Sequence, residues 1–66
     1  MWIKTAHNKL INSDQLSAVV YDSKHDQTVG CFNSGKTIKI DSGDCVDLIA
    51  GALSCNYDYL EVKQYE

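Results

Sequence analysis

The chain has 66 residues, a net charge of −3 at pH 7, 44% hydrophobic residues and no proline. A chain of this length forms one domain, residues 1–66, and its ordinary apolar content excludes a disordered protein. No apolar run approaches the roughly 20 residues of a membrane span, and the first residues lack the features of a secretory signal. We therefore expect a small, soluble domain in the cytoplasm that does not associate with a membrane.

The first two thirds of the chain predict strands, because β-branched and aromatic residues alternate between polar turns. The opening strand continues, after a turn at His7 and Asn8, as a short second strand, and three further strands follow. Together they span Met1–Ala6, 9–11, Leu16–Asp22, Thr28–Asn33 and Lys36–Asp41. We expect the last three to form an antiparallel meander, with a tight turn at Gly35 and a bulge or close approach at Gly30.

The period changes after this meander. Between Asp44 and Cys55 the apolar residues recur at the spacing of a helix face, at positions 45, 48, 49, 52 and 53. We expect Asp41 or Ser42 to cap this helix, Asn56 to end it and Gly51 to allow close packing on a neighbour.

The tail from Tyr57 to Tyr65 alternates again and predicts a last strand, with Leu60 and Val62 facing the core. With the opening strand and its continuation counted together, the order is β-β-β-β-α-β. The predicted fold is therefore α+β, an antiparallel β-meander packed by one helix.

The cysteines indicate neither a disulfide framework nor a metal site. Cys31, Cys45 and Cys55 are odd in number, and no two of them are spaced as Cys-x-x-Cys. We interpret them as small apolar fillers in a reducing compartment, and we expect no metal and no cofactor.

No motif for catalysis stands out. His7 and His25 lie in polar turns, and the carboxylates of Asp41, Asp44 and Asp47 are explained by helix capping and a solvated face. The Gly-Lys-Thr run at 35–37 lacks the earlier glycine of a phosphate loop and leads into a strand. We expect no catalytic residue and no enzyme activity.

The tail carries the candidate interface or ligand residues. Tyr57, Tyr59 and Tyr65 share one face of the predicted last strand with Lys63, and Trp2 joins them as a candidate, although we expect it to pack against the sheet. We expect this strand to form a sheet edge, which favours self-association into a dimer or a larger oligomer. All six basic residues are lysine, and the lack of arginine argues against direct nucleic-acid binding.

The opening Trp2-Ile3-Lys4-Thr5 and the later Leu10-Ile11-Asn12 resemble small proteins common in phages and mobile elements of Gram-positive bacteria. This chain departs from them at His7-Asn8, where such proteins often have Asp-Gly. The resemblance implies a bacterial host cytosol and a non-catalytic, oligomeric binding protein. It further implies an antagonist of host defence, which sequesters a nucleotide signal or blocks a defence protein. Two alternatives are a structural interaction module without a ligand and an acidic mimic of DNA.

Overall fold

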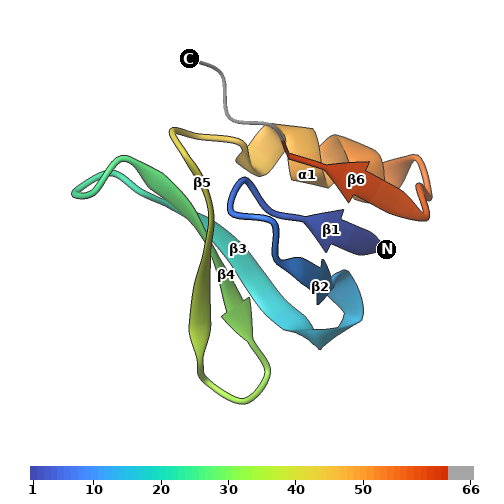
Figure 1. The fold of residues 1–66 in the computed structure, drawn as a ribbon, viewed down its shortest axis with the longest axis horizontal. Helices are drawn as coiled ribbons and strands as arrows, with labels where there is room; N and C mark the ends of the chain where they lie inside the picture. The colour runs from blue at the N-terminus through green and yellow to red at the C-terminus, as the bar shows by residue number, and fades with distance from the viewer. Residues whose placement is uncertain (63–66) are drawn as a thin grey trace.

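The computed structural model describes residues 1–62, which form six strands, one short 3-10 helix and one α-helix (Figure 1). In chain order these are β1 (Trp2–Lys4), β2 (Leu10–Asn12), η1 (Ser13–Gln15), β3 (Leu16–Asp22), β4 (Gln27–Phe32), β5 (Thr37–Ser42), α1 (Val46–Ser54) and β6 (Tyr59–Glu61). The α+β class is confirmed. No helix within these residues is long and apolar enough to cross a membrane.

The strands form two three-stranded sheets rather than one. The first sheet has the order β2-β1-β6, and the second has the order β3-β4-β5. The predicted antiparallel meander of three consecutive strands is confirmed in the second sheet. The prediction of a single meander is wrong, because β1 pairs antiparallel with β2 and parallel with β6, from the far end of the chain. The order before the helix is also corrected, to five strands instead of four.

Two glycines help to form the second sheet, one in a turn between strands and one inside a strand. Gly35 has a φ of +93° at the turn between β4 and β5, where the backbone N–H of Phe32 donates to Lys36 O at 2.7 Å. A Cβ atom on Gly30 would lie 3.2–3.4 Å from the side chains of Leu16, Ile40 and Ile38. The close approach predicted at this glycine is therefore confirmed, and it lets β4 sit against the core.

A buried threonine organises the β1–β2 hairpin of the first sheet. Thr5 Oγ1 accepts hydrogen bonds from the backbone N–H groups of His7 and Lys9 at 3.3 and 3.1 Å. The next residue, Ala6, donates its N–H to Ile40 O of β5 at 3.0 Å. The hairpin therefore also ties the first sheet to the outer strand of the second.

The helix is shorter than predicted and begins differently. Cys45 occupies the N-cap without a side-chain cap bond, so the prediction of a cap at Asp41 or Ser42 is wrong. Those two residues lie in β5, which runs on for one residue beyond the predicted strand end. Asp44 Oδ1 instead accepts from the N–H of Val46 at 3.1 Å.

The end of the helix is as predicted, but the reason given for its glycine is not. Asn56 has a φ of +56° and ends α1 in the left-handed region. A Cβ atom on Gly51 would meet nothing within 4 Å in the described chain. The prediction that this glycine allows close packing on a neighbour is therefore wrong.

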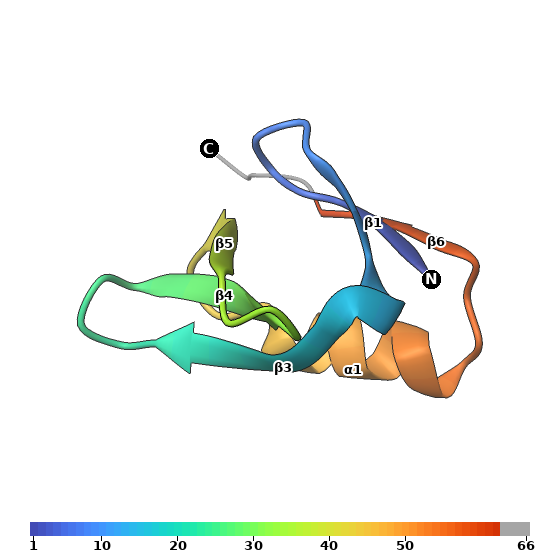
Figure 2. The same cartoon turned by 90° about the horizontal axis from the view of Figure 1, so that it is seen from below.

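The core lies where the two sheets and the helix face one another (Figure 2). Ile3 of β1 and Ile40 of β5 are fully buried, and Ile49 of α1 joins them. Half-buried side chains surround this centre, among them Met1, Leu16, Val19, Phe32, Ile38, Cys45 and Leu60. The helix buries little more than Ile49 and Ala52, so much of the predicted apolar helix face stays in solvent.

Candidate binding surface

The outer face of the first sheet carries exposed aromatic side chains. Trp2 and Tyr59 are register partners on the parallel strands β1 and β6, and they are 48% and 50% exposed. Leu10 on β2 is 58% exposed. Side chains alternate along each strand, so Ile3 and its neighbours at the middle of each strand face the core and leave these three outside. We call this surface the Trp2 face; it consists of Trp2, Lys4, Leu10, Asn12, Tyr59 and Glu61.

One ion pair borders the aromatic residues of the Trp2 face. Lys4 Nζ lies 3.5 Å from Glu61 Oε1, and the two residues are also register partners. Both side chains are about two-fifths exposed, so the pair contributes on the order of 0–1 kcal/mol to stability. Its main effect is to make the charge beside the aromatic rings nearly neutral.

The structure brings together only part of the predicted tyrosine stripe. Tyr59 lies on the Trp2 face, but Tyr57 precedes β6 and lines a hollow beside α1 with Leu48 and Gly51. Trp2 is 48% exposed on the outer face of the first sheet, so about half of its side chain is accessible for a contact. Lys63 and Tyr65 lie outside the described residues. The edge position predicted for the last strand is confirmed for β6.

Leu10 is the exposed apolar residue of this surface that was not among the candidates from the sequence. The strand prediction included it, but its alternation with buried Ile11 went unused. That alternation could have placed it outside.

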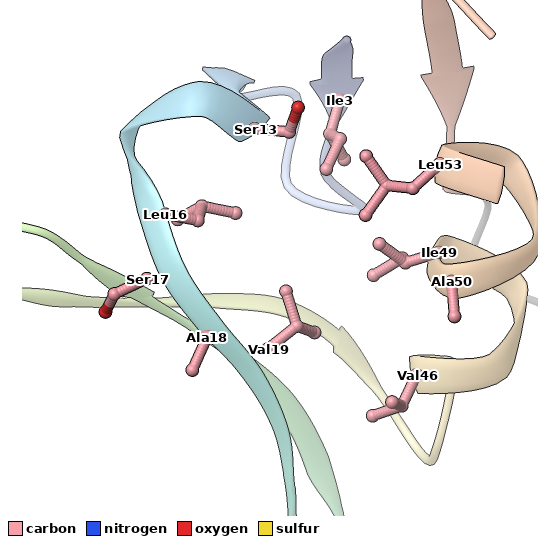
Figure 3. A pocket seen from close by; sticks show the side chains of 10 residues that line it. All are labelled: Ile3, Ser13, Leu16, Ser17, Ala18, Val19, Val46, Ile49, Ala50 and Leu53. Atoms are coloured by element: carbon pink, nitrogen blue, oxygen red, sulfur yellow. The ribbon is translucent and has the colours of Figure 1, made fainter. Parts of the chain in front are cut away.

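A second surface feature is an apolar groove between β3 and α1, with a volume of about 240 Å³ (Figure 3). Leu16 and Val19 of β3 point across it toward Ile49 and Leu53 of α1, and Ile3 lies behind. This groove is not predictable from the sequence, since no local pattern shows that β3 and α1 are neighbours.

The three cysteines differ in exposure, with Cys31 and Cys45 half-buried and Cys55 exposed. Cys45 is half-buried, and burial raises the pKa of its thiol, with a further increase from Asp41 and Asp44 and an opposing hydrogen bond from Thr28. A thiol of raised pKa is mostly protonated near neutral pH and therefore a poor nucleophile. Cys55 is exposed, so the interpretation as an apolar filler is wrong for that residue.

The two histidines sit in separate loops, His7 between β1 and β2 and His25 between β3 and β4. His25 Nδ1 lies 2.7 Å from Asp22 Oδ2, and this bond is the main reason that the pKa of Asp22 is lowered. At the end of β3, Tyr21 donates its hydroxyl to Asp26 Oδ1 in the same hairpin loop at 2.6 Å, which raises the pKa of the tyrosine. These bonds hold the hairpin tip together.

The remaining chemical candidates are also dispersed. The Gly-Lys-Thr run lies in the β4–β5 turn and enters β5, as predicted. Within residues 1–62, no three His, Cys, Asp or Glu side chains come together as a metal site. Comparisons with protein families, with curated proteins and with solved structures found no match to this chain.

Proposed function

We propose that this chain is a non-catalytic binding protein that captures a protein partner on the Trp2 face. The observation that carries the proposal is the side-by-side position of Trp2 and Tyr59, two aromatic side chains half exposed on one sheet face. Tryptophan and tyrosine are the side chains that most often anchor protein interfaces, because they bury a large area at a small entropic cost. Leu10 extends the same surface.

The charge of the surface favours a protein over a nucleotide as the partner. A sheet with exposed aromatic residues can also stack nucleobases, and such sites pair their rings with basic side chains that bind phosphate. On this face Glu61 neutralises Lys4, and the chain as a whole carries −3. A phosphate group would therefore meet little attraction there.

The resemblance of the opening residues to small phage proteins supports a biological setting for this activity. In that setting the partner is a protein of a bacterial defence system, which the chain blocks by binding. The resemblance rests on short runs at β1 and β2, and Trp2 of the Trp2 face belongs to the first of them.

The proposal is tested by affinity capture from lysates of Gram-positive hosts, followed by identification of the retained proteins. We expect Tyr59→Ser to lose the partner that the wild-type chain retains. Tyr57→Ser is the matched control, because Tyr57 is equally exposed and lies two residues away, beside α1. Circular dichroism would verify that both variants fold.

Trp2 provides a second readout, since it is the single tryptophan of the chain. Its fluorescence should change when the identified partner is added and stay constant when nucleotides are added. A fluorescence change with nucleotides alone would favour sequestration of a nucleotide signal. Equal capture by the wild type and Tyr59→Ser would refute a role for the Trp2 face.

A further inference from the structure

The four sheet edges of the molecule differ in how far they are covered. β2 and β6 are edges of only three residues each, and Ala6 already donates a hydrogen bond to Ile40 at the outer side of β5. β3 is the longest strand, with seven residues. Within residues 1–62, no backbone hydrogen bond reaches its outer edge from another element. β3 is therefore the edge with the most free hydrogen-bonding groups.

The free groups of this edge can be assigned from the alternation along β4. The N–H of Asn33 donates to Gln15 on the β3 side, whereas the N–H of Phe32 donates to Lys36 on the β5 side. Successive residues of a strand point their N–H and C=O groups in opposite directions, so Val29 faces β3, where it pairs with Val20. The backbone groups of Val19 and Tyr21 consequently point away from the sheet.

The side chains of this edge do not protect it. Natural edge strands are shielded by charged side chains, by proline or by a covering element. Residues 16–21 contain no charge and no proline, and Val20 and Tyr21 are 45% and 39% exposed. Within the described part of the chain, the one shielding device at this edge is a register irregularity between Leu16 and Ala18, at one end of the strand.

The first half of β3 borders a groove, and the second half carries a side chain that could cover the same groove in a second copy. Leu16 and Val19, in the first half, form one wall of the apolar groove against α1. Tyr21, in the second half, lies on the same face as Val19, two residues on, and its ring is exposed while its hydroxyl is bonded to Asp26 of its own hairpin. If two copies pair antiparallel about Val19, Tyr21 of each copy lies near Ser17 of the other, where the register irregularity of β3 falls, at the mouth of that groove.

The charges select the same arrangement. Asp22 is the one charged residue of β3, and an antiparallel pair places the two Asp22 side chains at opposite ends. A parallel pair would place them side by side, where like charges repel. Each chain carries −3, so pairing through an uncharged surface such as this one avoids bringing like charges together.

We propose that two copies of this chain form a twofold symmetric dimer through antiparallel pairing of their β3 strands, in which Tyr21 of each copy covers the groove of the other. An isologous contact of this kind closes on itself and stops at two subunits. It joins the two second sheets into one six-stranded sheet and leaves both Trp2 faces free. The dimer adds self-association to the proposed function, and it does not depend on the partner bound at the Trp2 face.

The oligomeric state of the purified chain tests the proposal, measured by light scattering and sedimentation equilibrium at tens of micromolar. We expect a dimer for the wild type and for Tyr21→Phe, and a monomer for Tyr21→Lys, which would place a charge in each groove. Tyr59→Lys is the matched control and should remain dimeric, because Tyr59 is an exposed tyrosine on an edge strand of the other sheet. A monomeric wild type, or a larger open assembly, would overturn the proposal.

Hydrogen exchange of the wild-type chain decides the question independently of any variant that fails to fold. The amides of Val19 and Tyr21 should become protected as the concentration rises, whereas the amide of Val20, bonded within the sheet, should show no such dependence. Exchange of Val19 and Tyr21 that does not change with concentration would overturn the proposal. So would a dimer that survives Tyr21→Lys and dissociates with Tyr59→Lys. Loss of partner capture with an intact dimer would instead concern the Trp2 face.

Discussion

The two sheets of this molecule are built in different ways. The second sheet has strands of seven, six and six residues that follow one another in the chain and are joined by short loops. The first sheet has three strands of three residues, and it pairs the beginning of the chain with its end. Such short ladders provide few hydrogen bonds, so the first sheet depends mainly on buried side chains such as Ile3. The comparison separates a sheet held by local pairing from one held by the core.

The sharpest way to break the first sheet is Ile3→Ala. Ile3 is fully buried at the middle of β1, and its truncation should lower the free energy of unfolding by about 2–5 kcal/mol. That is a large share of the stability expected for so small a domain. Urea denaturation measures the change. Leu10→Ala in the same sheet is the control, and because Leu10 is exposed it should cost no more than about 0.5 kcal/mol. Equal effects of the two substitutions would contradict a first sheet held by its buried side chains.

The link between the second sheet and the helix is broken by Thr28→Val. Thr28 is fully buried in β4, where its Oγ1 donates to Gly43 O at 2.7 Å and accepts from the N–H of Cys45 at 2.9 Å. Valine has the same shape but leaves both backbone groups without a partner, so we expect a loss of about 1–3 kcal/mol. Thr37→Val is the control, because Thr37 is exposed on β5. A loss confined to the control would show that these two bonds do not stabilise the fold.

The two sheets also differ in how far they could be predicted from the sequence. Alternation between Thr37 and Asp41, together with the turn at Gly35, was enough for the second sheet, since both are local patterns. The pairing of Trp2 with Tyr59 was not predictable in this way, because three-residue strands carry too little alternation to name a partner. The aromatic residues of the binding surface were found in the sequence as candidates. Their positions relative to one another required the parallel pair.

The helix lies beside both sheets, and Gly51→Ala should strengthen it without favouring either one. The added methyl group meets nothing within 4 Å, and alanine in a helix is about 0.5–1 kcal/mol more favourable than glycine. We expect the free energy of unfolding to rise by that amount in a urea titration. A decrease would mean that a surface close to Gly51 is occupied in solution.

The smallest effect is expected at the tip of the β3–β4 hairpin, from His25→Ala. The hydrogen bond from His25 is the largest cause of the lowered pKa of Asp22, so its removal should return that pKa toward its ordinary value. A lowered carboxyl pKa stabilises the fold above the unfolded pKa, and this contribution disappears as the pH falls through the folded pKa. The substitution should therefore reduce stability slightly at neutral pH and not in strong acid. NMR titration of the Asp22 carboxyl measures the shift, and an unchanged titration would contradict the assigned cause.

The parallel pairing of β1 with β6 has a consequence for biosynthesis. A ribosome delivers residues in order, so β1 is made well before β6 and must wait for this neighbour until residues 59–61 have been translated. The β3–β4–β5 meander can form on the nascent chain in the meantime, while Trp2 and Ile3 remain without a strand beside them on that side. Completion of the first sheet is thus postponed until β6 has been translated, and premature stop codons ahead of Tyr59 would yield products that lack one of the three strands of this sheet.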